Sequence, residues 1–255
     1  MSVAVVTAAN GGIGRAVVRS LLAGNVVSRV VAVDLAEPVT SLPGLPGGAE
    51  PLCCDLRTDE GLATLAEAVP GEVAVLVNVL GGERQPPVEP IEDVAWPPPK
   101  VWDDIIDLNL SGVYRVTRLL AGRLVPGAAI CNVSSIAATM PWIVSPAYGA
   151  AKAALEHWNH SLATLLAERG IRVNLVRPGF VWSRQWQLVD RAEFEEVVRD
   201  RVPLRQVTGA TPTDREQTAD DVAQAVSFLC SPAAAHITGQ AVNVDGGAAL
   251  VRAAR

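Results

Sequence analysis

Short apolar runs rich in β-branched residues recur along the chain at regular intervals. They lie at 3–7, 29–34, 73–78, 128–133, 171–176 and 241–244, with a weaker candidate at 50–54. Runs that are apolar throughout predict strands buried on both faces of a sheet. Between them, apolar residues recur at helical spacing at 13–23, 59–69, 101–125, 147–169 and 219–230.

This alternation of strand and helix has no internal linker and predicts one α/β domain over residues 1–255. We expect a parallel sheet of about seven strands, covered by helices on both faces. Right-handed crossovers would make the sheet doubly wound. A chain of 26.7 kDa is long enough to bury a core of this kind.

Two stretches interrupt the alternation. Residues 83–100 are rich in proline and lack periodicity, and residues 183–217 are polar, with a short helix expected near 192–201. Both follow predicted strands, and ligands of an open α/β sheet bind beyond the carboxyl ends of its strands. We therefore expect both loops to border a substrate pocket.

The charge distribution excludes several classes of partner. The net charge is −6, with acidic residues and arginines interspersed and no basic block, which argues against nucleic acid or an anionic membrane. No apolar run approaches the roughly 20 residues that span a bilayer. The first residues resemble a strand more than a signal peptide, so a cytoplasmic protein is expected.

The cysteines and histidines give little sign of a metal site. Cys53, Cys54, Cys131 and Cys230 show no CxxC spacing, and Cys53 and Cys131 lie in apolar runs, which predicts buried, reduced thiols. His157 and His160 share a helix face but lack a third ligand in a matching pattern. We expect no metal.

A glycine-rich turn, Thr7-Ala-Ala-Asn-Gly-Gly-Ile-Gly14, joins the first strand to the first helix. Such a turn brings backbone N–H groups and a helix N-terminus to a pyrophosphate, as in Rossmann-like folds. Asp34 ends the second strand twenty residues after Gly14, where a carboxylate can bind a ribose diol and repel a 2′-phosphate. The following Leu35-Ala-Glu37 offers no arginine, so the predicted cofactor is NAD.

One tyrosine and one lysine, Tyr148 and Lys152, are four residues apart on a predicted helix. The chain has only two residues of each type, and arginine outnumbers lysine nineteen to two. Positions i and i+4 share a helix face, so the ammonium can lower the tyrosine pKa from roughly 10. A tyrosine tuned in this way can exchange protons near neutral pH. An ordinary surface pair is the alternative.

Together these motifs resemble the short-chain dehydrogenase/reductase family over essentially the whole chain. The family's TGxxxGIG, NNAG, YxxxK and PGxxxT motifs match residues 7–14, 78–81, 148–152 and 178–183, and its closing strand and turn match residues 237–247. Ser135 precedes Tyr148 by the usual thirteen residues. Asn109 matches the asparagine of the family's NxxG helix, and Asp55-Leu56 the pair that contacts adenine.

The resemblance implies a role for each matched residue. Tyr148 would transfer the proton, and Lys152 would lower the Tyr148 pKa and bind the nicotinamide ribose. Ser135 would hold the substrate oxygen, and Asn109 would position a water. Ser134 is the rival of Ser135, since only one of two successive strand residues faces the cofactor. The implied cofactor contacts, besides Tyr148 and Lys152, are Asn10, Gly12, Ile13, Gly14, Asp34, Asp55, Leu56, Asn78, Gly81, Pro178, Gly179, Val181 and Ser183.

Three departures from the family pattern bear on the cofactor site. Ala8 replaces the first glycine of the turn and puts a methyl group where the backbone approaches the cofactor. Val79 and Leu80 replace the second Asn and the Ala of NNAG, which puts strand-end hydrogen bonds in question. Ser183 replaces Thr and keeps the hydroxyl.

The substrate is indicated only by aromatic residues near the nicotinamide segment. Trp142, Phe180, Trp182 and Trp186 could line a pocket for a flat ring or a sugar face, or could pack the loop. Arg184 and Arg191 could bind an acidic group or remain solvated.

The sequence thus predicts an NAD(H)-dependent oxidoreductase that interconverts an alcohol and a ketone, or a lactol and a lactone, on a small molecule. Two alternatives stay open: a cofactor-binding scaffold or redox sensor without turnover, and a dehydratase or epimerase of the extended relatives. The family resemblance also implies a homotetramer.

Overall fold

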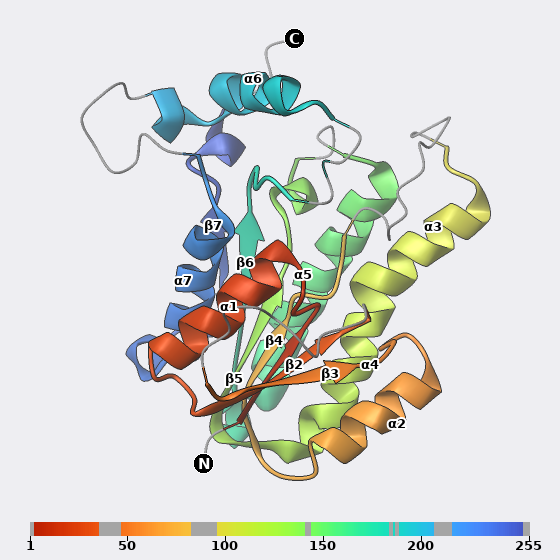
Figure 1. The fold of residues 1–255 in the computed structure, drawn as a ribbon, viewed down its shortest axis with the longest axis vertical. Coiled ribbons are helices and arrows are strands. Elements are labelled where there is room, and N and C mark those ends of the chain that lie inside the picture. The colour runs from red at the N-terminus through yellow and green to blue at the C-terminus, as the bar shows by residue number, and fades with distance from the viewer. Residues whose placement is uncertain are drawn as a thin grey trace.

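The computed structural model describes residues 3–35, 47–82, 96–140, 144–183, 186, 189–206 and 216–251. Its centre is a parallel sheet of seven strands in the order β3-β2-β1-β4-β5-β6-β7 (Figure 1). The predicted fold class is confirmed. The strands are β1 (Val3–Thr7), β2 (Arg29–Asp34), β3 (Ala49–Cys53), β4 (Val73–Asn78), β5 (Leu124–Val133), β6 (Arg172–Pro178) and β7 (Ala241–Val244).

Helices cover both faces of this sheet. They are α1 (Gly12–Ala23), α2 (Asp59–Ala68), α3 (Pro99–Ile106), α4 (Gly112–Leu120), α5 (Pro146–Leu166), α6 (Arg191–Arg201) and α7 (Ala219–Cys230). The first and last, α1 and α7, pack against each other on one face, while α2, α4 and α5 cover the other. Helix α6 lies beyond the carboxyl ends of the strands (Figure 1).

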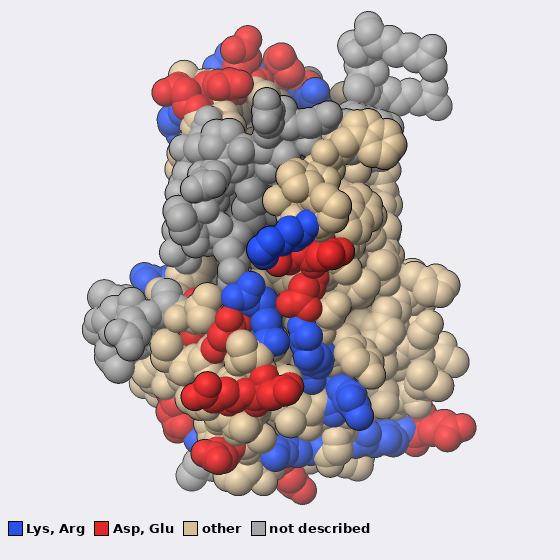
Figure 2. Space-filling model, turned by 90° about the vertical axis from the view of Figure 1, so that its right-hand side faces the viewer, with Lys and Arg blue, Asp and Glu red and all other residues tan. Residues whose placement is uncertain are grey.

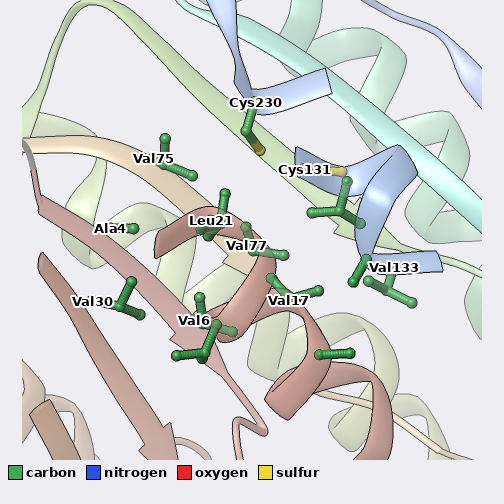
Figure 3. Close-up of a cluster of buried hydrophobic side chains, with 14 of the residues drawn as sticks. Ala4, Val6, Val17, Leu21, Val30, Val75, Val77, Cys131, Val133 and Cys230 are labelled. Carbon is green, nitrogen blue, oxygen red and sulfur yellow. The ribbon is translucent and has the colours of Figure 1, made fainter. Parts of the chain in front are cut away.

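Side-chain alternation divides the apolar strand residues between two cores. On β1, Ala4 and Val6 face α1 and α7, whereas Val5 faces the opposite core. Figure 3 shows the first of these cores, in which strand residues meet Val17 and Leu21 of α1. Because both faces are buried, the strands need apolar residues at every position, which explains the continuous runs in the sequence.

One predicted helix, 101–125, is wrong in its extent. The segment contains α3, a π-helical turn (Asp107–Ser111), α4 and a 3-10 turn (Ala121–Arg123), and β5 already begins at Leu124. Leu124 pairs with Val73 of β4, and a register shift lies between this pair and the next, Val75 with Ala129. The prediction extended the helix too far because Leu124 also fits the helical spacing of apolar residues.

The edge strands are less buried than the sequence predicts. Cys53 of β3 is exposed, so its predicted burial is wrong, whereas Cys131 and Cys230 are buried. All four thiols are free. Strand β3 lies at the edge of the described sheet beside β2, and each of its residues is partly or largely accessible to solvent.

Charges on the surface alternate in sign. Figure 2 shows blue and red side chains side by side on one face of the molecule, with tan surface beside them. Ion pairs account for part of this pattern, among them Arg57–Asp55, Lys100–Asp104 and Arg115–Asp107. Among the described residues, no helix has the length and apolar character needed to cross a membrane.

Candidate active site

The glycine-rich turn leaves the N-terminus of α1 open. The N-cap Gly11 makes no side-chain cap, so the first N–H groups of the helix remain available to a ligand. Gly12 is exposed, and a methyl group there would meet only the Ala219 side chain, at 4.0 Å. A methyl group on Gly14 would lie 2.2 Å from the Ala8 carbonyl oxygen, so the turn requires glycine there. This open helix end fits the pyrophosphate of a dinucleotide.

Asp34 reaches back from the end of β2 to the same turn. Its Oδ2 accepts a hydrogen bond from the Asn10 N–H at 2.8 Å. The Asn10 amide oxygen in turn accepts from Arg15 Nε at 3.0 Å. The carboxylate is therefore fixed beside the open helix end, where a ribose next to the pyrophosphate would lie.

Val79 and Leu80, which depart from the family's NNAG motif, still form hydrogen bonds at the end of β4 through their backbone N–H groups. The Thr7 hydroxyl, fully buried, accepts hydrogen bonds from Val79 N–H at 3.0 Å and Leu80 N–H at 2.9 Å. Because these donors belong to the main chain, the bonds do not depend on the side chains at 79 and 80. The strand-end connection between β1 and β4 is intact.

Asn78 turns its side chain into the interior. Its Nδ2 donates to Thr117 Oγ1 at 3.1 Å and to Asn132 Oδ1 at 2.9 Å, and Asn132 Nδ2 donates to Asn159 Oδ1 at 2.9 Å. These contacts tie β4 and β5 to α4 and α5. Asn78 therefore supports the site from behind, and its amide nitrogen is engaged away from the turn.

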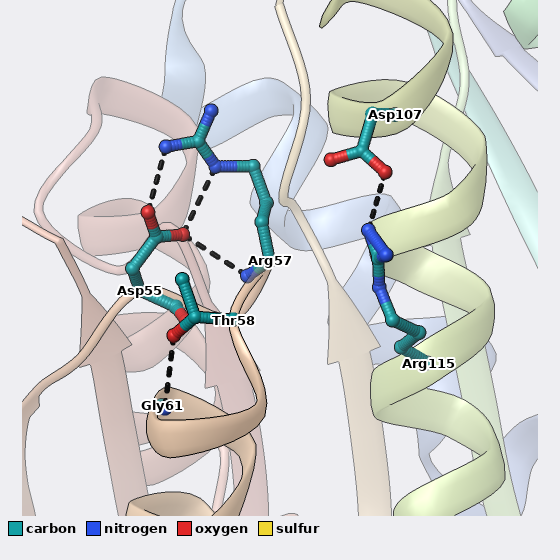
Figure 4. A network of polar contacts seen from close by, with 6 residues as sticks. All are labelled: Asp55, Arg57, Thr58, Gly61, Asp107 and Arg115. Carbon is teal, nitrogen blue, oxygen red and sulfur yellow. Dashed lines mark hydrogen bonds and ion pairs between the residues drawn. The ribbon is translucent and has the colours of Figure 1, made fainter.

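The predicted adenine contact, Asp55-Leu56, follows β3. Figure 4 shows the Arg57 guanidinium against the Asp55 carboxylate, with hydrogen bonds of 2.9 and 2.7 Å. The hydrogen bonds from Arg57 lower the Asp55 pKa below its usual value. Leu56 is buried. The carboxylate is thus held as an anion, and the adenine contact stays a prediction.

Tyr148 and Lys152 meet at the start of α5. The Lys152 Nζ lies 5.6 Å from the centre of the Tyr148 ring and donates a hydrogen bond to the Val133 carbonyl at 2.9 Å. Only 2 % of Lys152 is exposed, and burial lowers its pKa to about 8, which the Glu156 charge partly opposes. Such burial separates this pair from an ordinary surface ion pair.

Asn109 joins the pair from the π-helical turn between α3 and α4. Its Nδ2 donates to the carbonyls of Gly82 and Ile105, at 2.7 and 2.9 Å, and its Oδ1 accepts from Gly82 N–H at 2.9 Å. A methyl group on Gly81 would lie 2.7 Å from both Asn109 Oδ1 and Lys152 Nζ. π-Helical turns are frequent at functional sites, and this one brings Asn109 to the lysine.

The structure distinguishes the two candidate serines. Ser134 Oγ donates to Glu156 Oε1 at 2.7 Å, so Ser134 is committed to the interior. Ser135 is partly exposed and caps the 3-10 turn Ile136–Ala138 by accepting from Ala137 N–H at 3.1 Å. A methyl group on Gly149 would lie 3.2 Å from the Ala137 carbonyl, so this turn packs against the turn of α5 that carries Tyr148.

The nicotinamide segment predicted at 178–183 leaves the end of β6. Pro178 and Val181 are buried, whereas Ser183 is partly exposed. Gly179 N–H donates to the Val244 carbonyl, and a methyl group on Gly179 would lie 2.8 Å from Asp245. Glycine at 179 thus allows β6 to end against the turn that follows β7.

Two of the four aromatic residues predicted for the pocket are packed inside the protein. Phe180, 3 % exposed, and the partly buried Trp186 join a core cluster with Phe194 of α6. Trp182 is 40 % exposed and contacts Phe194 edge-on. Arg191 lies over the Trp182 ring at 4.9 Å and pairs with Glu195 and Glu216. Trp142 and Arg184 lie outside the described residues.

Buried polar residues behind the site carry no motif in the sequence, and Glu156 and Asn159 are two of them. Glu156, 6 % exposed, binds Ser134 and Arg177, and Asn159 binds Asn132. Glu156 lies four residues after Lys152, so the same helix spacing that singled out Tyr148 could have found it.

Comparisons with known proteins identify the family of the chain. A family model described as enoyl-(acyl carrier protein) reductase matches residues 7–249. The chain is 32% identical over 254 residues to 3-oxoacyl-[acyl-carrier-protein] reductase FabG of Escherichia coli (strain K12), covering 98% of each chain. It is 30% identical to 7alpha-hydroxysteroid dehydrogenase of the same organism, covering 96% of this chain and 92% of the relative.

A solved structure of 7α-hydroxysteroid dehydrogenase in complex with NADH and 7-oxo glycochenodeoxycholic acid is similar throughout. The TM-score is 0.80 at 28% identity, covering 96% of this chain and 93% of that one. The shared fold and the matched motifs point to the same family, and Asn109, Tyr148 and Lys152 lie close together as its motifs imply. This chain belongs to the short-chain dehydrogenase/reductase family and is an oxidoreductase that acts on alcohol and ketone groups.

Proposed function

We propose that the protein is an NAD(H)-dependent oxidoreductase that interconverts a secondary alcohol, or a sugar hydroxyl or lactol, and the corresponding ketone or lactone. The observation that carries this proposal is the buried Lys152 ammonium beside the Tyr148 ring. A buried cation next to a phenol favours the phenolate, the form that accepts a proton.

Tyr148 is the proton carrier in this proposal. During reduction its hydroxyl gives a proton to the substrate oxygen, and during oxidation its phenolate takes that proton back. The Ser135 hydroxyl, on the turn that packs against α5, donates a hydrogen bond to the same oxygen and stabilises the charge that develops there. A bound nicotinamide supplies or accepts the hydride.

Lys152 is held in place by its neighbours. The Val133 carbonyl accepts a hydrogen bond from its ammonium group. The absence of a side chain at Gly81 leaves the space in which Nζ and the Asn109 amide approach each other. In this arrangement the ammonium lies beside the tyrosine with one N–H held by the Val133 carbonyl, and another N–H would bind a ribose hydroxyl. Asn109 positions a water that connects the lysine to solvent.

Asp34 supports NAD over NADP. Its carboxylate is fixed by Asn10 N–H beside the open end of α1. It can accept hydrogen bonds from both hydroxyls of an adenosine ribose, whereas a 2′-phosphate would meet a negative charge at short range. The Arg15 guanidinium is bonded to the Asn10 amide oxygen and carbonyl.

Cofactor titration tests this part of the proposal. NADH and NADPH are titrated by fluorescence into the wild type and into Asp34→Ser/Leu35→Arg. The wild type is expected to bind NADH at least tenfold more tightly, since about 1.4 kcal/mol of repulsion suffices for that ratio, and the variant should prefer NADPH. Equal wild-type affinities would refute the preference for NAD.

Trp182 is the aromatic residue best placed to border the substrate. Of the described pocket aromatics it is the most exposed, at 40 %, and Phe194 and Arg191 contact its ring. We assign it to one wall of the pocket for a flat or ring-shaped substrate. Trp182→Ala should raise KM for ring substrates and leave KM for small aliphatic ketones nearly unchanged.

A further inference from the structure

A buried carboxylate outside the predicted catalytic set lies one helical turn from Lys152. Glu156 is 6 % exposed and belongs to the same helix, α5. Its Oε1 accepts from Ser134 Oγ at 2.7 Å and from Arg177 Nε at 2.7 Å, and Oε2 accepts from Arg177 Nη2. A buried carboxylate with this many hydrogen-bond partners, one of them a guanidinium, is held at a fixed place.

These contacts connect the three chain segments that build the candidate site. Ser134 lies between Val133, which accepts the Lys152 hydrogen bond, and Ser135. Arg177 immediately precedes Pro178 and Gly179 at the end of β6. Glu156 therefore joins the serine turn and the nicotinamide segment to the helix that carries Tyr148 and Lys152.

The charges around Lys152 make Glu156 electrostatically important. Among the described residues, the Val133 carbonyl, the Asn109 amide and the Tyr148 ring also approach the ammonium, and none of these three carries a fixed charge. Burial lowers the Lys152 pKa, and the Glu156 charge raises it. On its far side, Glu156 faces Arg177, which reaches Asn243 of β7 at 3.3 Å, and Asn243 in turn reaches Asp245 at 3.4 Å.

We propose that Glu156 is a positioning residue that fixes the Ser134–Ser135 turn against α5 and supplies the buried negative charge that keeps Lys152 protonated. Arg177 limits this effect by neutralising part of the Glu156 charge. The inference deepens the proposed function, because a protonated Lys152 is what favours the Tyr148 phenolate.

The chain offers an unusually direct test, since Lys100 and Lys152 are its only lysines. Protein labelled with 13C at the lysine Cε gives two side-chain NMR signals, and Lys100→Arg assigns them. In Glu156→Gln, the Lys152 signal should titrate about one pH unit lower than in the wild type, because an opposing charge is lost. In Arg177→Gln it should titrate higher, because the Glu156 charge is no longer compensated.

Opposite shifts distinguish an electrostatic role from structural damage, which would move both variants in the same direction. Glu168→Gln removes the same charge from an exposed position beyond the end of α5 and should leave the Lys152 titration unchanged. If Glu156→Gln fails to fold, the upward shift in Arg177→Gln still decides. An unchanged Lys152 titration in the folded variants would overturn the proposal.

The titration needs neither cofactor nor substrate. It can therefore refute the role of Glu156 while the proposed reaction stands, and it can support that role even if the proposed reaction is wrong. The activity readout is the pH profile of kcat for alcohol oxidation. Its rise should move to higher pH in Glu156→Gln, because a less charged lysine stabilises the phenolate less.

Discussion

Asn109 Oδ1 and Lys152 Nζ approach the same point, each 2.7 Å from the position that a methyl group on Gly81 would occupy. The two side chains come from the π-helical turn and from α5, far apart in sequence. Gly81, with a φ of +148°, adopts a conformation that disfavours other residues and leaves the space that both polar groups need.

Gly81→Ala is therefore expected to lower kcat by about a hundredfold, since displacing a catalytic group by about 1 Å can cost that much. The methyl group must push the ammonium or the amide away. Gly71→Ala is the matched control, because nothing lies within 4 Å of a methyl group there. Equal rates for the two variants would show that the close approach at Gly81 has no catalytic consequence.

Removal of the Tyr148 hydroxyl should abolish most turnover. Tyr148→Phe loses the proton carrier, and a loss of 10²–10⁴-fold is typical for a general acid or base. NADH binding, measured by fluorescence, should stay nearly unchanged. The only other tyrosine, Tyr114, is 45 % exposed on α4, and Tyr114→Phe should retain full activity. Wild-type turnover in Tyr148→Phe would assign the proton transfer elsewhere.

The strands were the most predictable part of the fold. Four of them begin and end where their apolar runs do, because a sheet covered on both faces requires apolar residues throughout. The same property hides which face of the sheet each side chain points to, since polar residues do not mark either face. The sequence predicts Asn78 beside the cofactor but does not show that its amide nitrogen bonds Thr117 of α4 and Asn132 of β5.

The motif residues of the candidate site could be found in the sequence, whereas most of the contacts between them could not. Spacing placed Tyr148 and Lys152 on one helix face, but their burial depends on β5 and on the π-helical turn. Glu156 carries no motif, and its partners Ser134 and Arg177 come from different strands. Likewise, Phe180 and Trp186 pack with Phe194 of α6, a long-range contact that local sequence does not encode.

Lys152 should make the stability of the protein depend on alkaline pH. Its pKa is about 8 in the folded protein and 10.5 ordinarily, so between these values the unfolded state binds more protons. The free energy of unfolding contributed by this group therefore rises with pH from about 8 to 10.5, by about 3 kcal/mol at most.

Urea unfolding of the wild type and of Lys152→Met at several pH values isolates this contribution. The difference in unfolding free energy between the two proteins should change across that range, and a constant difference would contradict the prediction. Other alkaline groups cancel in the comparison, because both proteins contain them.

Ala8 has a φ of +49°, in the left-handed region, at the position where the family has glycine. A Cβ in this region costs roughly 1–2 kcal/mol, whereas glycine adopts it freely but loses more entropy on folding. Ala8→Gly should therefore stabilise the protein by about 1 kcal/mol. Ala9→Gly is the matched control: Ala9 is fully buried and its φ is not positive, so the variant should lose stability. Urea unfolding measures both changes, and a loss of stability in Ala8→Gly would show that the turn does not strain this alanine.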